Sequence, residues 1–176
     1  MELLIVLAVA AILTSSAVPT FSSLIQRNQA AVAINWIVES IRFSRHSAVT
    51  LGTMVTICPS TDGTHCGGKW HDGTIVFTDA NADAVVNGKD EILKRFRFPV
   101  EGASLTWRAF RNRQYLQLTS MGYTNFMNGN FTYCSEDRDP RYARQIVINM
   151  PGRVRKAYDI DNDGIVEDYR GRELRC

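Results

Sequence analysis

The hydrophobic and polar positions divide the chain into an apolar N-terminal stretch and a mixed remainder. Residues 3–13 read LLIVLAVAAIL, eleven positions without a charge, and the first basic residue is Arg27. A bilayer span needs about 20 apolar residues, and the mildly polar continuation to Ile25 supplies the missing length. Apolar residues then recur at helical spacing, which predicts one helix from about Glu2 to about Val49. The residues that set this spacing are Phe21, Leu24, Ile25, Ala31, Ile34, Ile37, Val38 and Ile41.

Beyond residue 51 the pattern changes to short apolar runs separated by Asp-Gly, Asn-Gly and Pro-Gly pairs. Such runs are typical of β-strands, and the intervening pairs are typical of tight turns. A helix followed by strands predicts an α+β domain, in which the long N-terminal helix packs on an antiparallel β-sheet head. The expected strands are Thr53–Cys58, Thr74–Thr78, Glu91–Phe98, Ser104–Phe110, Tyr115–Leu118, Gly129–Cys134 and Gln145–Asn149.

Basic residues are concentrated in one part of the chain. The net charge of the protein is only +2, yet residues 94–158 hold twelve Lys or Arg against four acids, a net +8 that the remainder offsets with −6. Such a basic segment favours a polyanionic partner, because binding releases condensed counterions. The alternative is a basic face that is merely solvated.

The four cysteines, an even number, fit two disulfides in a head that faces an oxidising compartment. Three pairings are possible. We favour Cys58–Cys66, which closes a short loop, and Cys134–Cys176, which attaches the C-terminal tail to the head. The alternative is a zinc site, whose spacing would match no common zinc module. Its ligands would be Cys58, His65, Cys66 and His71.

No catalytic constellation is visible. The three histidines lie near no nucleophile motif, and there is no phosphate-binding loop or dinucleotide fingerprint. We therefore expect no enzymatic activity and no cofactor.

An acidic segment near the C-terminus carries carboxylates at alternate positions, an arrangement that can surround a calcium ion. Glu167 and Asp168 can complete such a site, but its twelfth position, where an EF-hand has a bidentate glutamate, is Arg170. We favour a solvated acidic turn without metal. The calcium alternatives are Asp159, Asp161 and Asp163 and, more weakly, Asp79, Asn81 and Asp83.

Glu2 opens the apolar run, although a carboxylate in lipid is costly and usually functional. The string from Glu2 to Val9 resembles the start of type IV pilins, in which a glutamate precedes a long apolar helix. The resemblance implies that Glu2 pairs with the amine of a neighbouring subunit during filament assembly. It also implies processing by a prepilin peptidase and N-methylation. The Gly-Phe-Thr-Leu segment of the family's cleavage site is missing from this sequence, so no residue is assigned to cleavage.

Three motifs in the head narrow the resemblance to the FimT/GspH branch of minor pilins and pseudopilins. They are Trp70-x-x-Gly73-x-Ile75-Val76-Phe77-x-Asp79, Gly122 through Phe131 to Cys134, and Ile146-Val147-Ile148 followed by Gly152-Arg153-Val154-Arg155. The resemblance implies a membrane-spanning or filament-core helix at 1–26 and a periplasmic head at 27–176. The head divides into a helical part to about 49, a β-rich part at 50–150 and a disulfide-attached tail at 151–176. The implied location is the bacterial inner membrane, in a single pass, with incorporation into a surface pilus beside other pilins.

The segment from Gly152 to Lys156 resembles the DNA-binding element of FimT-type pilins, which take part in DNA uptake during natural transformation. In an extended chain Arg153 and Arg155 point to the same side, and their guanidinium groups suit phosphates. The resemblance implies DNA as a partner, with little sequence preference. The alternative is a structural minor pilin or a type II secretion pseudopilin, whose arginines only solvate an edge strand. The predicted DNA-binding residues are Gly152, Arg153, Arg155, Lys156, Arg141 and Arg144, with Arg111 and Arg113 as a possible addition from a loop.

Overall fold

A single long helix organises the molecule. The computed structural model describes residues 2–176, apart from the side chains of residue 2 and residues 7–20. Helix α1 (Glu2–Leu51) matches the predicted helix. It ends at Gly52, whose left-handed backbone (φ +63°) is a common helix terminator. The side chain of Glu2, predicted to act in filament assembly, lies outside the described residues.

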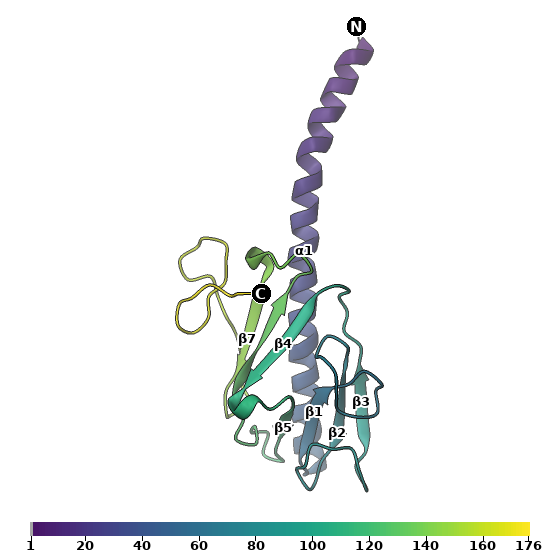
Figure 1. Ribbon diagram of the computed structural model, residues 1–176, viewed down its shortest axis with the longest axis vertical. Coiled ribbons are helices and arrows are strands. Elements are labelled where there is room, and N and C mark those ends of the chain that lie inside the picture. The colour runs from purple at the N-terminus through teal and green to yellow at the C-terminus, as the bar shows by residue number, and fades with distance from the viewer. Residues whose placement is uncertain (1) are drawn as a thin grey trace.

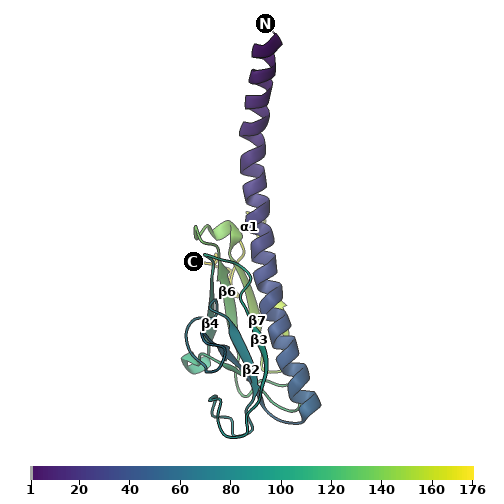
Figure 2. The same cartoon turned by 90° about the vertical axis from the view of Figure 1, so that its right-hand side faces the viewer.

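The two halves of α1 have different surroundings. The first half projects away from the head (Figures 1 and 2), and the side chains of residues 3–6 are exposed there. The second half lies along the head, where Ala33, Ile37 and Ala48 are fully buried. Within the described part of the chain, no helix combines the length and the apolar character needed to cross a membrane.

The head contains two antiparallel sheets where the sequence predicted one. The first has the strand order β3-β2-β1-β5 and the second has the order β4-β6-β7-β8. The α+β class is therefore confirmed, and the division into two sheets is added to it. The strands are β1 (Val55–Pro59), β2 (Thr74–Thr78), β3 (Ile92–Phe96), β4 (Ser104–Ala109), β5 (Leu116–Leu118), β6 (Gly129–Cys134), β7 (Arg144–Ile148) and β8 (Val154–Lys156), with short 3-10 helices η1 (Phe110–Asn112) and η2 (Pro140–Tyr142).

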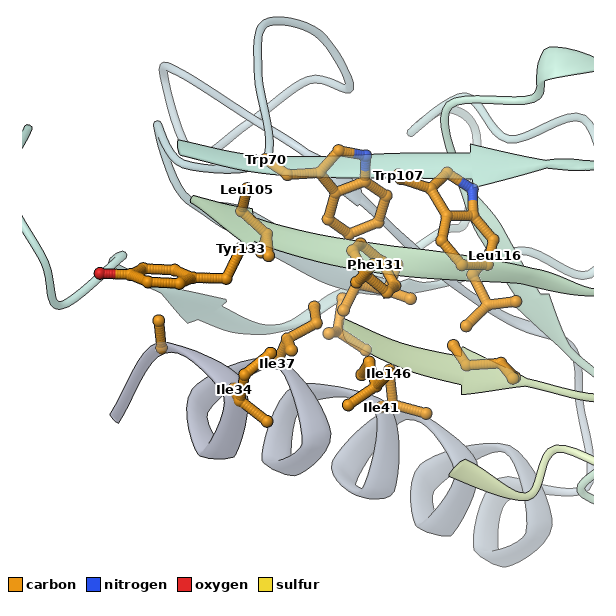
Figure 3. Packing of buried hydrophobic residues seen from close by; sticks show 14 of the residues in the cluster. Ile34, Ile37, Ile41, Trp70, Leu105, Trp107, Leu116, Phe131, Tyr133 and Ile146 are labelled. Atoms are coloured by element: carbon orange, nitrogen blue, oxygen red, sulfur yellow. The ribbon is translucent and has the colours of Figure 1, made fainter. Parts of the chain in front are cut away.

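The core lies between α1 and the sheets (Figure 3). Phe131 on β6 stacks on Trp107 of β4 at 4.4 Å between ring centroids and meets Trp70 edge-on at 4.7 Å. Ile37 and Ile41 of the helix pack beneath this cluster. Each large side chain buried in this way contributes about 1.5–3 kcal/mol, so the second half of α1 is held firmly against the sheets.

Two disulfides brace the head and the tail. Cys58 is bonded to Cys66 and Cys134 to Cys176, the two pairs that the sequence favoured, each with 5.6 Å between Cα atoms. The zinc alternative is wrong, because its two sulfur ligands are bonded to each other.

Asp79 serves the fold, not a metal. It is fully buried, and its carboxylate accepts hydrogen bonds from Thr56 Oγ1 at 2.5 Å and Gln117 Nε2 at 2.8 Å. The backbone N–H groups of residues 83 and 84 donate to it as well, both at 3.1 Å. These donors satisfy the carboxylate, so the weaker calcium candidate, which would need Asp79, is not supported.

Candidate nucleic-acid interface

The segment that resembles a DNA-binding element forms a tight hairpin between β7 and β8. The N–H of Gly152 donates to the carbonyl of Asn149 at 2.9 Å, and the N–H of Arg153 donates to the side-chain oxygen of Asn149, also at 2.9 Å. Gly152 has φ +73°, and a Cβ there would lie 2.8 Å from the carbonyl oxygen of Gly122. Both the left-handed backbone and the close approach require glycine at this turn.

The hairpin turn is fixed on the rest of the head. Thr124 donates its N–H to the carbonyl of Met150 at 2.9 Å, and its hydroxyl donates to the carbonyl of Met127 while lying 3.1 Å from that of Met150. The side chain of Arg45, near the end of α1, covers the same place: a Cβ on Gly122 would lie 2.9 Å from its Nε. Helix, loop and hairpin therefore hold the start of β8 in one position.

The two faces of β8 carry different side chains. Val154 pairs with Ile148 and packs against the core, so alternation places Arg155, and Arg153 just before the strand, on the opposite face; both are exposed. Lys156 points to the helix side instead, and its Nζ lies 3.5 Å from Oδ1 of Asn35. The arginine pair and Lys156 therefore do not form one patch.

In the described part of the chain, the basic side chains of the β7–β8 hairpin make no close ion pair with an acid. Among the residues that the structure describes, close ion pairs join Asp62 to His65, Asp139 to Arg141 and Asp168 to Arg172. None of these pairs includes a basic side chain of the hairpin. Its positive charge is therefore available to an external anion.

Arg141 and Arg144 do not extend the hairpin surface as predicted. Nε of Arg141 donates to Asp139 at 3.0 Å, and this hydrogen bond raises the pKa of Arg141 and lowers that of Asp139. Arg144 is half-buried and donates to the carbonyl of Ala143 at 2.7 Å. Burial, and then the charge of Arg27, lower the pKa of Arg144. Both lie at or before the start of β7, whereas the turn follows its end.

Sequence reasoning missed a third arginine on the face of Arg155. Across the second sheet, Arg108 on β4 is paired with Asn130, Asn130 with Val147, and Val147 with Arg155. Paired residues in neighbouring strands point to the same face. Arg108 is exposed and therefore adds a charge to this face, about 14 Å from Arg155 across three strand spacings. The alternation of apolar and polar residues along β4 would have identified Arg108 from the sequence.

A hollow of about 310 Å³ lies near the same end of this sheet. It is flanked by Phe110 and Phe126, which are 61% and 77% exposed. Asn125, also in its lining, directly follows the threonine that holds the hairpin turn. The guanidinium of Arg111 lies 5.5 Å from the centre of the Phe110 ring.

The backbone around the hollow is strained. Arg111 and Phe126 have φ values of +62° and +52°, a conformation that is unfavourable for a bulky side chain. Strain of this kind persists where the surrounding structure enforces it and is concentrated at functional sites. Arg111 and Arg113 were named from the sequence, but the two phenylalanines were not.

Comparison with known proteins finds related chains. The family described as Type II transport protein GspH matches residues 33–152. The type IV minor pilin FimU of Pseudomonas aeruginosa is similar in two crystal forms. One has a TM-score of 0.57 at 14% identity over 78% of this chain and 92% of FimU, and the other 0.52 at 16% over 73% and 91%. The minor pseudopilin EpsH of the Vibrio cholerae type 2 secretion system has a TM-score of 0.50 at 11% identity over 73% of this chain and 95% of EpsH. No curated protein matches the chain significantly in sequence.

The family match extends from the second half of α1 through strands β1 to β7 and ends at Gly152, before β8. It covers more than half of the chain, and the solved structures share the arrangement of a long helix on antiparallel strands. The chain therefore belongs to the GspH family and is a minor pilin or pseudopilin of the FimT/GspH type.

Proposed function

We propose that this protein is a minor pilin that binds DNA and takes part in its uptake during natural transformation. The observation that carries the proposal is a pair of exposed arginines, Arg153 just before β8 and Arg155 within it. Alternation along the chain places both arginines on the face opposite Val154, and the turn before them is held by Gly152 and Thr124. Neither arginine is engaged by an acid in the described part of the chain.

This geometry suits a phosphate backbone. Alternate residues of a strand are about 6.8 Å apart, so two guanidinium groups can meet different phosphates of one strand. Contacts of this kind fix a protein on DNA without reading its sequence. We therefore expect little sequence preference and a strong dependence on salt.

The hollow beside the hairpin adds a surface for unpaired bases. Exposed aromatic rings stack on bases of any sequence, and each such contact contributes about 1–3 kcal/mol. Phe110 and Phe126 offer rings, and Arg111 and Arg113 supply positive charge next to them. The proposed DNA-binding surface therefore consists of Arg153, Arg155 and Arg108 together with this hollow.

The projecting half of α1 supports the proposed role as a membrane-anchored pilin subunit. Its exposed apolar residues, among them Leu3 and Phe21, fit the inner membrane before assembly and the filament core among other pilin subunits afterwards. Glu2 is proposed to make the assembly contact after cleavage by a prepilin peptidase. The two disulfides fit a head that folds in the periplasm.

The test is a titration of labelled duplex DNA with the full chain in nonionic detergent, at several salt concentrations. Replacing both Arg153 and Arg155 by Gln removes two phosphate contacts, so we expect affinity to fall roughly tenfold to a hundredfold near 0.1 M salt. The slope of log affinity against log salt should decrease by about 2.

The matched control removes the same charge from the other end of the sheet. Arg138→Gln with Arg175→Gln changes two exposed arginines near the Cys134–Cys176 disulfide. This control should bind DNA within about twofold of the unchanged chain, because the charges that it removes lie far from the hairpin, beyond about a Debye length. Equal losses of DNA affinity in both double variants would show that net charge alone accounts for the effect. The hairpin would then be ruled out as the DNA-binding site.

The second candidate is a structural role in a pilus or in type II secretion, which the description of the matched family favours. An experiment in cells distinguishes the two candidate functions. With both hairpin arginines replaced, transformation should fall while piliation and secretion persist. Unchanged transformation in this variant, together with no DNA binding by the purified unchanged protein, would favour the structural role.

A further inference from the structure

The tail after β8 folds back over the second sheet and forms a compact acidic loop. Val166 and Leu174 pack on Ala143, and the disulfide to Cys134 holds the end of the chain. Between these anchors the loop brings carboxylate oxygens within 4.8 Å of one another. The residues that supply them are Asp159, Asp161, Asp163 and Glu167.

Glu167 sets this cluster apart from an ordinary acidic turn. Its side chain is inside the protein, with only 5% of the residue exposed. Its Oε2 accepts the N–H of Ile160 at 2.7 Å, but its Oε1 is buried without a hydrogen-bond donor in the described part of the chain. A buried carboxylate oxygen without a partner is costly. A cation held by the cluster would remove that cost.

Among the described residues, Arg144 acts electrostatically on Asp159 but forms no close ion pair with the cluster. The close ion pairs of the described residues include none of its four carboxylates. Four acids in so small a volume repel one another unless a cation lies among them.

The dimensions of the cluster fit calcium. Calcium binds six to eight oxygens at about 2.3–2.6 Å, so opposite ligands lie about 4.6–5.2 Å apart. The carboxylate oxygens of the cluster lie within 4.8 Å of one another, a separation that falls in this range. Magnesium needs ligands at about 2.0–2.1 Å in strict octahedral geometry, which is a poorer match.

We propose that Asp159, Asp161, Asp163 and Glu167 bind one calcium ion, which fixes the C-terminal tail against the second sheet. The sequence named these residues as a calcium alternative, but a solvated turn was favoured because the twelfth position of the loop is Arg170. The fourth carboxylate comes from the ninth position instead. The proposal does not depend on DNA binding.

The test is calorimetric titration of calcium into the EDTA-treated full chain, in nonionic detergent and with its disulfides intact. We expect one site with a dissociation constant on the order of 10⁻⁴ M or tighter, and weaker binding of magnesium. Glu167→Gln keeps the shape of the side chain but removes a charged ligand, and Asp161→Asn does the same at an exposed position. Each should weaken calcium binding about tenfold or more.

The matched control is Glu173→Gln, which removes one exposed charge from the segment that bridges to residue 167. It should leave calcium affinity unchanged. A second readout is trypsin cleavage after Arg170 and Arg172, which calcium should slow in the unchanged chain and in the control but not in Asp161→Asn.

Two results would overturn the proposal. The first is the absence of calcium binding by the unchanged chain up to about 10 mM, well above the range of weak extracellular sites. The second is calcium affinity in Asp161→Asn equal to that of the unchanged chain. Asp161 is exposed, so its replacement tests the site even if Glu167→Gln fails to fold.

Discussion

At the scale of single residues, Gly152 combines a left-handed backbone with too little room for a Cβ beside a backbone carbonyl. Its φ is +73°, and an added Cβ would lie 2.8 Å from the carbonyl oxygen of Gly122. A left-handed backbone costs an ordinary residue about 1–2 kcal/mol, whereas a collision with a fixed carbonyl forces the hairpin to move. The conformation of Gly152 therefore sets where the arginines of β8 stand.

Gly152→Ala should consequently lower the free energy of unfolding by roughly 2–4 kcal/mol, measured by urea denaturation. The control is Gly52→Ala, which has a similar φ of +63° but nothing within 4 Å of the added Cβ. This control should lose only about 1 kcal/mol. Equal losses at the two positions would show that the collision with Gly122 contributes nothing.

At the scale of elements, the sequence predicted those parts of the fold that local pattern determines. The helix and seven of the eight strands follow from periodicity and turn residues. Strand β8 was not among the expected strands, and an edge strand at its arginines appeared only in the alternative interpretation, because its three residues carry two charges and show no apolar run. Only its pairing with β7 makes the segment a strand, and that pairing is a tertiary contact.

The candidate sites also combine features that the local sequence determines with features that depend on tertiary contacts. The shared side of Arg153 and Arg155 was predictable, because alternation is a local property. The ion pair of Arg141 with Asp139 was not, because it depends on the geometry of η2. The fourth carboxylate of the acidic loop was named as a candidate, but its burial could not be read from the sequence, because it depends on how the tail packs.

The tail and the hairpin should be separable elements. The tail is held by the Cys134–Cys176 disulfide and a small apolar cluster, whereas β8 is held by its pairing with β7. Replacing both cysteines by Ala opens a loop with a sequence separation of 42. We expect the free energy of unfolding to fall by about 2–4 kcal/mol, with faster proteolysis of the tail and DNA affinity within about twofold. A collapse of DNA affinity would mean that the tail positions the hairpin.

At the scale of the whole molecule, the proposed DNA-binding surface lies at one pole of the head. The side chain of Arg45, close to the end of α1, lies against the glycines of the turn, whereas the N-terminal half of α1 projects from the opposite pole (Figure 1). Burial of the projecting half in a filament would therefore leave the hairpin and the hollow uncovered by the subunit's own helix. Parts distant in sequence, from β4 to β8, meet at this pole.

The last prediction tests whether hairpin and hollow act as one surface. Phe126 is largely exposed and has an unfavourable backbone, so Phe126→Ala should leave the free energy of unfolding nearly unchanged. Loss of a stacked base should nevertheless weaken single-stranded DNA binding by about 1–3 kcal/mol, with little effect on duplex DNA. The control is Tyr169→Ala, since Tyr169 is 74% exposed and also lies beside an arginine, but in the tail.

Varying the length of the oligonucleotide tests whether one DNA strand contacts both the hollow and the arginines. A strand of about ten nucleotides can reach both the hollow and the arginines, whereas one of about three reaches only one of them, given a rise of about 3.4 Å per nucleotide. The longer strand should therefore lose affinity both in Phe126→Ala and in the double arginine variant, with nearly additive effects. The shorter strand should respond to one of the two variants only. If Phe126→Ala weakens neither strand, the hollow is not part of the surface, and the arginines of β8 account for DNA binding alone.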